Sequence, residues 1–171
     1  DSVVAWQSLA GVYRRDRDAR IKVYERGLKA NPASVELTML LGTELELAER
    51  REDAIKLYEN LLKENPKAEP AVNNLAALLL DYRSDKASWK RALELAKTLQ
   101  AAENPAVLDT LGWAHYRNAQ YAEAVSVLER VVAKSAQFPI FHYHLGMAYV
   151  ATGNKVGAKQ ELKRAVDDAK S

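Results

Sequence analysis

The stretch L-D-T-L-G-W-A-H-Y-R-N-A-Q-Y-A-E-A-V-S-V-L-E-R-V, residues Leu108–Val131, decides the predicted fold. Its apolar residues follow helical spacing on both sides of a short polar turn at Arg117–Gln120, which indicates two amphipathic helices. Gly112 lies inside the first helix, where a glycine costs about 1 kcal/mol relative to alanine. We attribute it to close contact between the paired helices, with Ala124 facing it from the first turn of the second helix.

The pairing of a small residue with an alanine twelve residues later recurs along the chain. Leu41-Gly42 is followed in this way by Ala54, and Leu145-Gly146 by Ala158. With Ala76 included, the small residues recur about every 34 residues. A period of this length with two helices per period predicts an α-helical solenoid. We therefore expect an all-α protein of about five helix-turn-helix repeats.

These residues resemble the tetratricopeptide repeat (TPR) family. The first-helix pattern of that family is W-x2-L-G-x2-Y, and it is matched, with Ala in place of Gly, by Trp6-x2-Leu9-Ala10-x2-Tyr13. Its second half is matched by Leu145-Gly146-x2-Tyr149, and the second-helix pattern is supplied by Ala54, Tyr58, Leu61 and Pro66. The resemblance implies a right-handed TPR solenoid and a role in protein–protein interaction.

We expect one array over residues 1–171, with repeats at about 2–32, 33–66, 67–104, 105–137 and 138–171. The chain does not start with Met and already begins inside a repeat, so we expect a piece of a longer protein. In the first repeat the turn is about two residues short, and Arg20 occupies the slot where Ala is expected. The third repeat carries about four extra residues within Asp81–Lys90. They include Trp89, which we interpret as packing over a helix end more readily than as a binding feature.

Charge and composition narrow the classes of function. The chain has 25 Lys and Arg against 23 Asp and Glu, and the two signs are interspersed. Nucleic-acid binding needs clustered Lys and Arg, so we expect no nucleic-acid partner. There is no cysteine, which excludes disulfides and cysteine-ligated metals. No apolar run approaches the roughly 18 residues needed to cross a bilayer.

The sequence offers no convergent set of catalytic groups. His142 and His144 are two residues apart on a predicted helix, so they point about 200° apart and cannot share a metal. There is no glycine-rich phosphate loop and no G-x-S-x-G elbow. We therefore expect neither an enzyme nor a cofactor or metal site.

The resemblance also implies a concave groove lined by the first helix of each repeat. From that pattern we predict a peptide-binding groove that includes Met39, Thr43, Asn73, Ala77, Asp109, Trp113, Tyr116, Tyr143 and Met147. Its C-terminal part is aromatic, and aromatic residues and Met dominate binding energy in buried contacts. We hypothesise that an extended or helical peptide anchors on these rings, with Asp109 and Asn73 bonding its backbone. For Trp113 the alternative is that its ring fills the inner curve of the array. A TPR carboxylate clamp is disfavoured, because the corresponding positions hold Gln7, Gly11, Pro70 and Asn74.

A narrower resemblance is carried by the runs Asn73–Ala76, Asp85–Ala87 and Asp109–Trp113. They are similar to bacterial envelope TPR proteins, in particular the exosortase-associated PEP-CTERM TPR lipoproteins, which implies exopolysaccharide or protein sorting. This resemblance favours a periplasmic or envelope location over a cytoplasmic one. Two alternatives stay open. One is a spacer that forms homo-oligomers through an uncapped C-terminal helix, and the other is polysaccharide binding on the Trp113 and Tyr143 rings.

Overall fold

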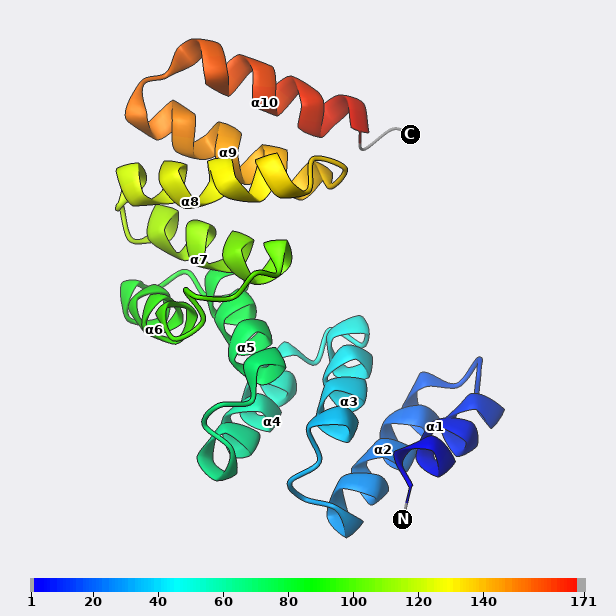
Figure 1. The fold of residues 1–171 in the computed structure, drawn as a ribbon. Helices are drawn as coiled ribbons and strands as arrows, with labels where there is room; N and C mark the ends of the chain where they lie inside the picture. The colour runs from blue at the N-terminus through cyan, green and yellow to red at the C-terminus, as the bar shows by residue number, and fades with distance from the viewer. Residues whose placement is uncertain (1, 169–171) are drawn as a thin grey trace. The chain divides into compact units, whose positions relative to one another are not determined.

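The computed structural model describes residues 2–168, and in this range the chain forms ten α-helices and no strand (Figure 1). Their bounds are α1 Val3–Val12, α2 Arg17–Ala30, α3 Val35–Leu47, α4 Arg51–Glu64, α5 Glu69–Asp81, α6 Lys86–Lys97, α7 Pro105–Arg117, α8 Tyr121–Lys134, α9 Pro139–Thr152 and α10 Lys155–Asp168. We call the odd-numbered helices A-type and the even-numbered helices B-type. The all-α prediction is confirmed.

The chain divides into two compact units. Unit 1 ends at Leu78 and unit 2 begins at Leu79, so the boundary falls within α5. In unit 1, α2 packs against α1 and α3, and α3 packs against α4. In unit 2, α7 packs against α6 and α8, while α9 packs against α8 and α10. The helices in these contacts are therefore held mainly by their neighbours in sequence, as in a repeat array.

Short polar side chains fix where several helices begin. An N-cap side chain accepts a hydrogen bond from a backbone N–H that has no partner inside the helix. The Ser34 hydroxyl accepts from Leu37 N at 3.2 Å, and the Asp85 carboxylate accepts from Ser88 N at 2.8 Å. Asn104 accepts from Ala106 N at 3.0 Å, and Pro105 occupies the first turn behind it, where a proline loses no helical hydrogen bond.

Three glycines of the A-type helices, Gly42, Gly112 and Gly146, let a large side chain of the paired helix lie against their backbone. A Cβ built on Gly112 would stand 2.5 Å from Cγ of Leu128, and one on Gly146 would stand 2.7 Å from Cγ of Leu162. Gly42 receives the ring of Tyr58 in the same way. The close contact was predicted with Ala124 as the facing residue, and the structure places a larger side chain of the same helix nearest to Gly112. The group nearest Gly112 is Leu128, one turn beyond Ala124, and Ala124 lies fully buried in the same cluster.

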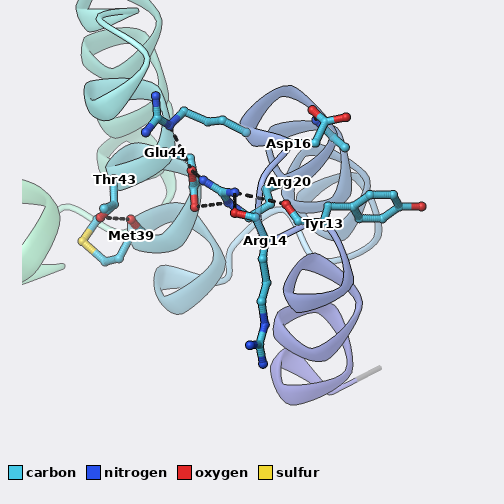
Figure 2. Close-up of polar contacts among 9 residues, drawn as sticks. Tyr13, Arg14, Asp16, Arg20, Met39, Thr43 and Glu44 are labelled. Atoms are coloured by element: carbon cyan, nitrogen blue, oxygen red, sulfur yellow. Dashed lines mark hydrogen bonds and ion pairs between the residues drawn. The ribbon is translucent and has the colours of Figure 1, made fainter.

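Arg20 accounts for the atypical first repeat (Figure 2). Its Nε and Nη2 donate to the two carboxylate oxygens of Glu44 in α3 at 2.8 and 2.9 Å, and Nη1 donates to the carbonyls of Arg14 at 2.8 Å and Tyr13 at 3.1 Å. One guanidinium thus covers the C-terminal end of α1 and joins α2 to α3. The missing residues belong to the helix and not to the turn, because α1 ends two residues after Ala10.

Replacing Arg20 with alanine is expected to lower the melting temperature of the chain, because the substitution leaves Glu44 and two carbonyls without this donor. Arg17→Ala is the matched control, since Arg17 makes only a longer 3.7 Å contact with the same carboxylate. Thermal denaturation followed by circular dichroism measures both variants. Equal melting temperatures for the two variants would contradict the role assigned to Arg20.

The extra residues of the third repeat do not place Trp89 in a loop. The connection between α5 and α6 is residues 82–85, and Trp89 lies in the first turn of α6. Its Nε1 donates to the Arg83 carbonyl at 2.8 Å, and its own carbonyl accepts from Asn118 Nδ2 at 2.9 Å. Most of the extra residues therefore lengthen the start of α6, and packing over a helix end, as predicted, describes the position of the Trp89 ring.

Candidate functional site

An aromatic cluster lies where α7 and α9 approach each other in unit 2. Its members are the rings of Trp113, Tyr116, Tyr121, Tyr143 and His144. Trp113 is stacked on Tyr116 with centroids 4.6 Å apart and on His144 with centroids 4.2 Å apart. Tyr143 is tilted against Trp113 at 6.1 Å. The structure thus brings together Trp113, Tyr116 and Tyr143, the three aromatic residues of the predicted groove.

Trp113 forms the base of this cluster. Its side chain is buried, and its Nε1 donates to the Asp81 carboxylate at 3.1 Å. A buried indole N–H needs a partner, and Asp81 supplies it. Trp113 therefore takes the packing role that the sequence left open as an alternative, and it contributes to any binding surface through the rings stacked on it.

His144, a member of the aromatic cluster, forms a buried pair with Asp109. A carboxylate only accepts, so His144 Nδ1 donates to Asp109, with distances of 3.0 and 2.9 Å to its two oxygens. Burial raises the pKa of Asp109, and the hydrogen bond from His144 opposes that rise. Both Asp109 oxygens lie within hydrogen-bond distance of His144 Nδ1. Asp109 therefore fixes the orientation of the His144 ring, on which Trp113 is stacked. Nothing in the sequence distinguished His144 as a member of the site.

His142 takes part in a separate contact. Its Nε2 donates to the Ala136 carbonyl at 2.8 Å, and its Nδ1 lies 2.5 Å from Glu161 Oε2 in α10. The sequence predicted that His142 and His144 diverge, and the structure confirms it, because they contact α10 and α7 respectively. Across residues 2–168 no three side chains of the His, Cys, Asp or Glu type are grouped so as to hold a metal ion.

The exposed part of the site is a stripe along α9. We call Ile140, Tyr143, Met147 and Val150 the α9 stripe. These residues follow a three-four-three spacing and therefore share one face of the helix. Ile140, Tyr143 and Val150 are 49%, 41% and 54% exposed, and Met147 is half-buried. Ile140 was missed by the sequence prediction, although its position six residues before Gly146 places it on the same face.

A cation borders the aromatic cluster. The Arg117 guanidinium carbon lies 4.2 Å from the ring centroid of Trp89 and 5.8 Å from that of Trp113. A guanidinium over an aromatic face is attracted by the ring quadrupole. The contact holds Arg117 beside the cluster, so one edge of the candidate surface is positively charged.

The other predicted groove residues belong to unit 1. Thr43 donates its hydroxyl to the Met39 carbonyl of its own helix at 3.0 Å (Figure 2). Asn73 and Ala77 are half-buried on α5. Beside them Tyr58 donates to Glu46 at 3.0 Å and accepts from Asn74 Nδ2 at 3.3 Å. Burial raises the pKa of Glu46, and the Tyr58 hydrogen bond opposes the rise. The hydrogen-bonded groups Thr43, Glu46, Tyr58 and Asn74 thus give this part of the predicted groove a polar character, within unit 1.

Among the helices of residues 2–168, none combines the length and the apolar character that crossing a lipid bilayer requires. The fold and the site together define a helical-repeat protein with an exposed apolar stripe on one of its helices.

The comparisons with known proteins give the family. A model of the tetratricopeptide repeat family matches residues 8–69 and 110–171, and the chain belongs to this family. A TPR repeat-containing protein of Pseudomonas aeruginosa is 30% identical over 113 residues, which are 64% of this chain. The chain spans 18% of that relative's length.

Solved structures show the same fold at low sequence identity. The MamA fragment 41-end from Desulfovibrio magneticus RS-1 has a TM-score of 0.77 at 16% identity, over 97% of this chain and 94% of that chain. A thermophilic TPR protein of Thermus thermophilus has a TM-score of 0.70 at 18% identity, over 99% of this chain and 90% of that chain. Both similarities concern the fold alone.

Proposed function

We propose that this chain is a non-catalytic scaffold that binds a peptide segment of a partner protein on the α9 stripe. The observation that carries the proposal is an exposed apolar row, Ile140, Tyr143 and Val150, on an ordered helix. Contiguous exposed apolar side chains on a protein surface mark interaction sites more often than scattered ones do. The family supports the class of function, since its repeats occur in protein-interaction scaffolds.

The contacts of Tyr143 with the buried rings beside it support a binding role for the α9 stripe. Tyr143 contacts both Trp113 and His144, and these rings are buried and hydrogen-bonded to Asp81 and Asp109. The ring of Tyr143 is thus restricted before a partner arrives. A restricted aromatic side chain loses less conformational entropy on binding, so more of the contact energy contributes to affinity.

We propose a bacterial envelope setting for this activity. The support is the sequence resemblance to exosortase-associated PEP-CTERM lipoproteins, together with a bacterial relative of the family. In this setting the chain is periplasmic or envelope-associated, and the partner belongs to a secretion or exopolysaccharide system. Fractionation of source cells with an antibody to this chain tests the location. Recovery in the cytoplasmic fraction alone would contradict it.

Replacing Tyr143 with alanine is expected to weaken partner binding about 10- to 100-fold and to leave the melting temperature within a few degrees of wild type. An aromatic anchor at the centre of an interface typically contributes about 2 kcal/mol or more. Partners are captured from an envelope extract on wild-type protein, and affinity for each is then measured by titration calorimetry.

Tyr13→Ala is the matched control, because Tyr13 is also 41% exposed but lies beyond the end of α1 in unit 1. It is expected to bind the partner as the wild type does. If Tyr143→Ala and Tyr13→Ala both retain full affinity, the α9 stripe is not the binding surface and the proposal fails.

A further inference from the structure

An apolar face of α1 is left open in the part of the chain that the structure describes. Leu9 is 37% exposed, Val12 is 75% exposed, and Ala5 is exposed as well. We call these three residues the α1 face. Gly11 beside them would carry a Cβ that meets no atom within 4 Å. Trp6 and Ala10, on the other side of the helix, pack inward.

The same positions are buried in α5, α7 and α9. Counted from the small residue of each helix, Leu9 stands one residue before it and Val12 two residues after it. The equivalent pairs are Leu75 and Leu78 in α5, Leu111 and Ala114 in α7, and Leu145 and Ala148 in α9. Their exposed fractions are 0% and 8%, 4% and 0%, and 3% and 0%. The α1 face thus has the composition of an interior surface and the exposure of an outer one.

A B-type helix covers these positions in α9 and in α3. Val125 and Val132 of α8 pack against the cluster that contains Leu145 and Ala148 of α9. In α3 the second position holds Glu44, and Arg20 of the preceding α2 pairs with it. The partner of an A-type face is therefore the B-type helix that comes before it in the chain.

We propose that the α1 face is the docking surface of a further B-type helix, which precedes Asp1 in the same polypeptide. The small residue of a B-type helix stands 22 residues before that of the next A-type helix for Ala54 and Ala76 and for Ala124 and Gly146, and 20 residues before it for Ala92 and Gly112. The proposed helix therefore has its small residue about 22 residues before Ala10, followed directly by an apolar residue. The related Pseudomonas protein extends well beyond the matched part, which is consistent with further repeats.

A second copy of α10 is a poor occupant of this face. The residue directly after the small position is apolar in the other B-type helices, namely Ile21, Ile55, Leu93 and Val125. In α10 this position holds Lys159, which is exposed. Docking α10 on the α1 face would bring an ammonium group against Leu9 and Val12 without a carboxylate to receive it, which costs desolvation energy.

Cysteine labelling tests the proposal in the natural polypeptide. Val12→Cys is made in the 171-residue chain, which contains no other cysteine, and in the full-length protein. Maleimide modification is followed by mass spectrometry of the peptide that contains residue 12. The expected result is rapid labelling in the 171-residue chain and labelling at least about tenfold slower in the full-length protein, because docked surfaces react only through local opening.

Val4→Cys is the control, since Val4 is 66% exposed on a different side of α1 and is expected to label equally in both proteins. Equal rates at residue 12 in the two proteins would overturn the proposal. Labelling of Val12→Cys that slows with increasing concentration of the 171-residue chain would also overturn it, because a second copy would then cover the face.

A chimera tests the chemistry of the occupant independently. Residues 118–137, which hold α8 and its following loop, are placed directly before Ser2. The expected result is slower hydrogen exchange along α1 and a higher melting temperature than the parent chain. The matched chimera carries Val125→Lys and Val132→Lys in the added copy and is expected to show neither change. Equal behaviour of the two chimeras would exclude apolar docking on the α1 face.

Discussion

Replacing Glu161 with alanine is expected to lower the free energy of unfolding by about 3 kcal/mol, because it breaks a buried pair from one side. His142 is 1% exposed, and both of its ring nitrogens face acceptors. The carbonyl of Ala136 can only accept, so Nε2 carries a hydrogen, and Nδ1 lies 2.5 Å from Glu161 Oε2. The alanine variant leaves this side of a buried imidazole without a partner. Urea denaturation at neutral pH measures the loss.

Two control variants separate the buried contact from surface charge. Glu161→Gln retains an amide group that can hydrogen-bond Nδ1 at the same place, so its cost should be clearly smaller than that of alanine. Arg164→Ala removes the exposed 3.8 Å contact with Glu161 and should change stability by less than about 0.5 kcal/mol. If Glu161→Ala is no less stable than Arg164→Ala, the His142 contact does not hold α10 on α9.

Replacing Gly112 with leucine is expected to cost about 1–3 kcal/mol, because the new side chain must displace the one already against the helix. Even a Cβ at this position would stand 2.5 Å from Leu128 Cγ and 2.6 Å from its Cδ2. Leu128 is fully buried, so its side chain has little room to yield. Ala124→Leu is expected to have a comparable effect, since Ala124 is fully buried in the same cluster. Chemical denaturation measures both variants.

Gly11→Ala is the control for helix propensity alone. A Cβ there meets no atom within 4 Å, so alanine should stabilise the helix by up to about 1 kcal/mol. Opposite signs for Gly11→Ala and Gly112→Leu would show that packing determines the second effect. An unchanged free energy of unfolding in both Gly112→Leu and Ala124→Leu would refute the packing scheme of the paired helices.

The order of the helices could be predicted from the sequence because it depends on local periodicity. Gly42, Gly112 and Gly146 each mark the middle of an A-type helix, and Pro and Asn residues mark the ends of the paired helices. The contacting side chain could not be predicted in the same way. Whether Ala124 or Leu128 lies over Gly112 depends on how the two helices slide along each other, and sequence spacing does not determine that displacement.

The sequence predicted which aromatic residues come together at the candidate site, but it did not predict which of them are buried and which are exposed. Spacing placed Trp113, Tyr116 and Tyr143 on related faces, and the structure brings their rings into contact. Whether each of these rings is buried depends on the residues of other helices that pack against it. Trp113 is covered because Asp81 and His144 lie beside it, and both come from other helices. The pairing of His144 with Asp109, 35 residues away, had no local signal.

The uneven distribution of the tryptophans allows the unfolding of the two units to be followed separately by intrinsic fluorescence. Trp6 is the sole tryptophan of unit 1, where it lies over Gly27, whereas Trp89 and Trp113 both belong to unit 2. Subtracting the emission of a Trp6→Phe variant from that of wild type therefore isolates the signal of unit 1. Denaturation curves from this difference and from the variant itself either coincide or separate. The separation between their midpoints measures how far cooperativity extends along the stacked repeats.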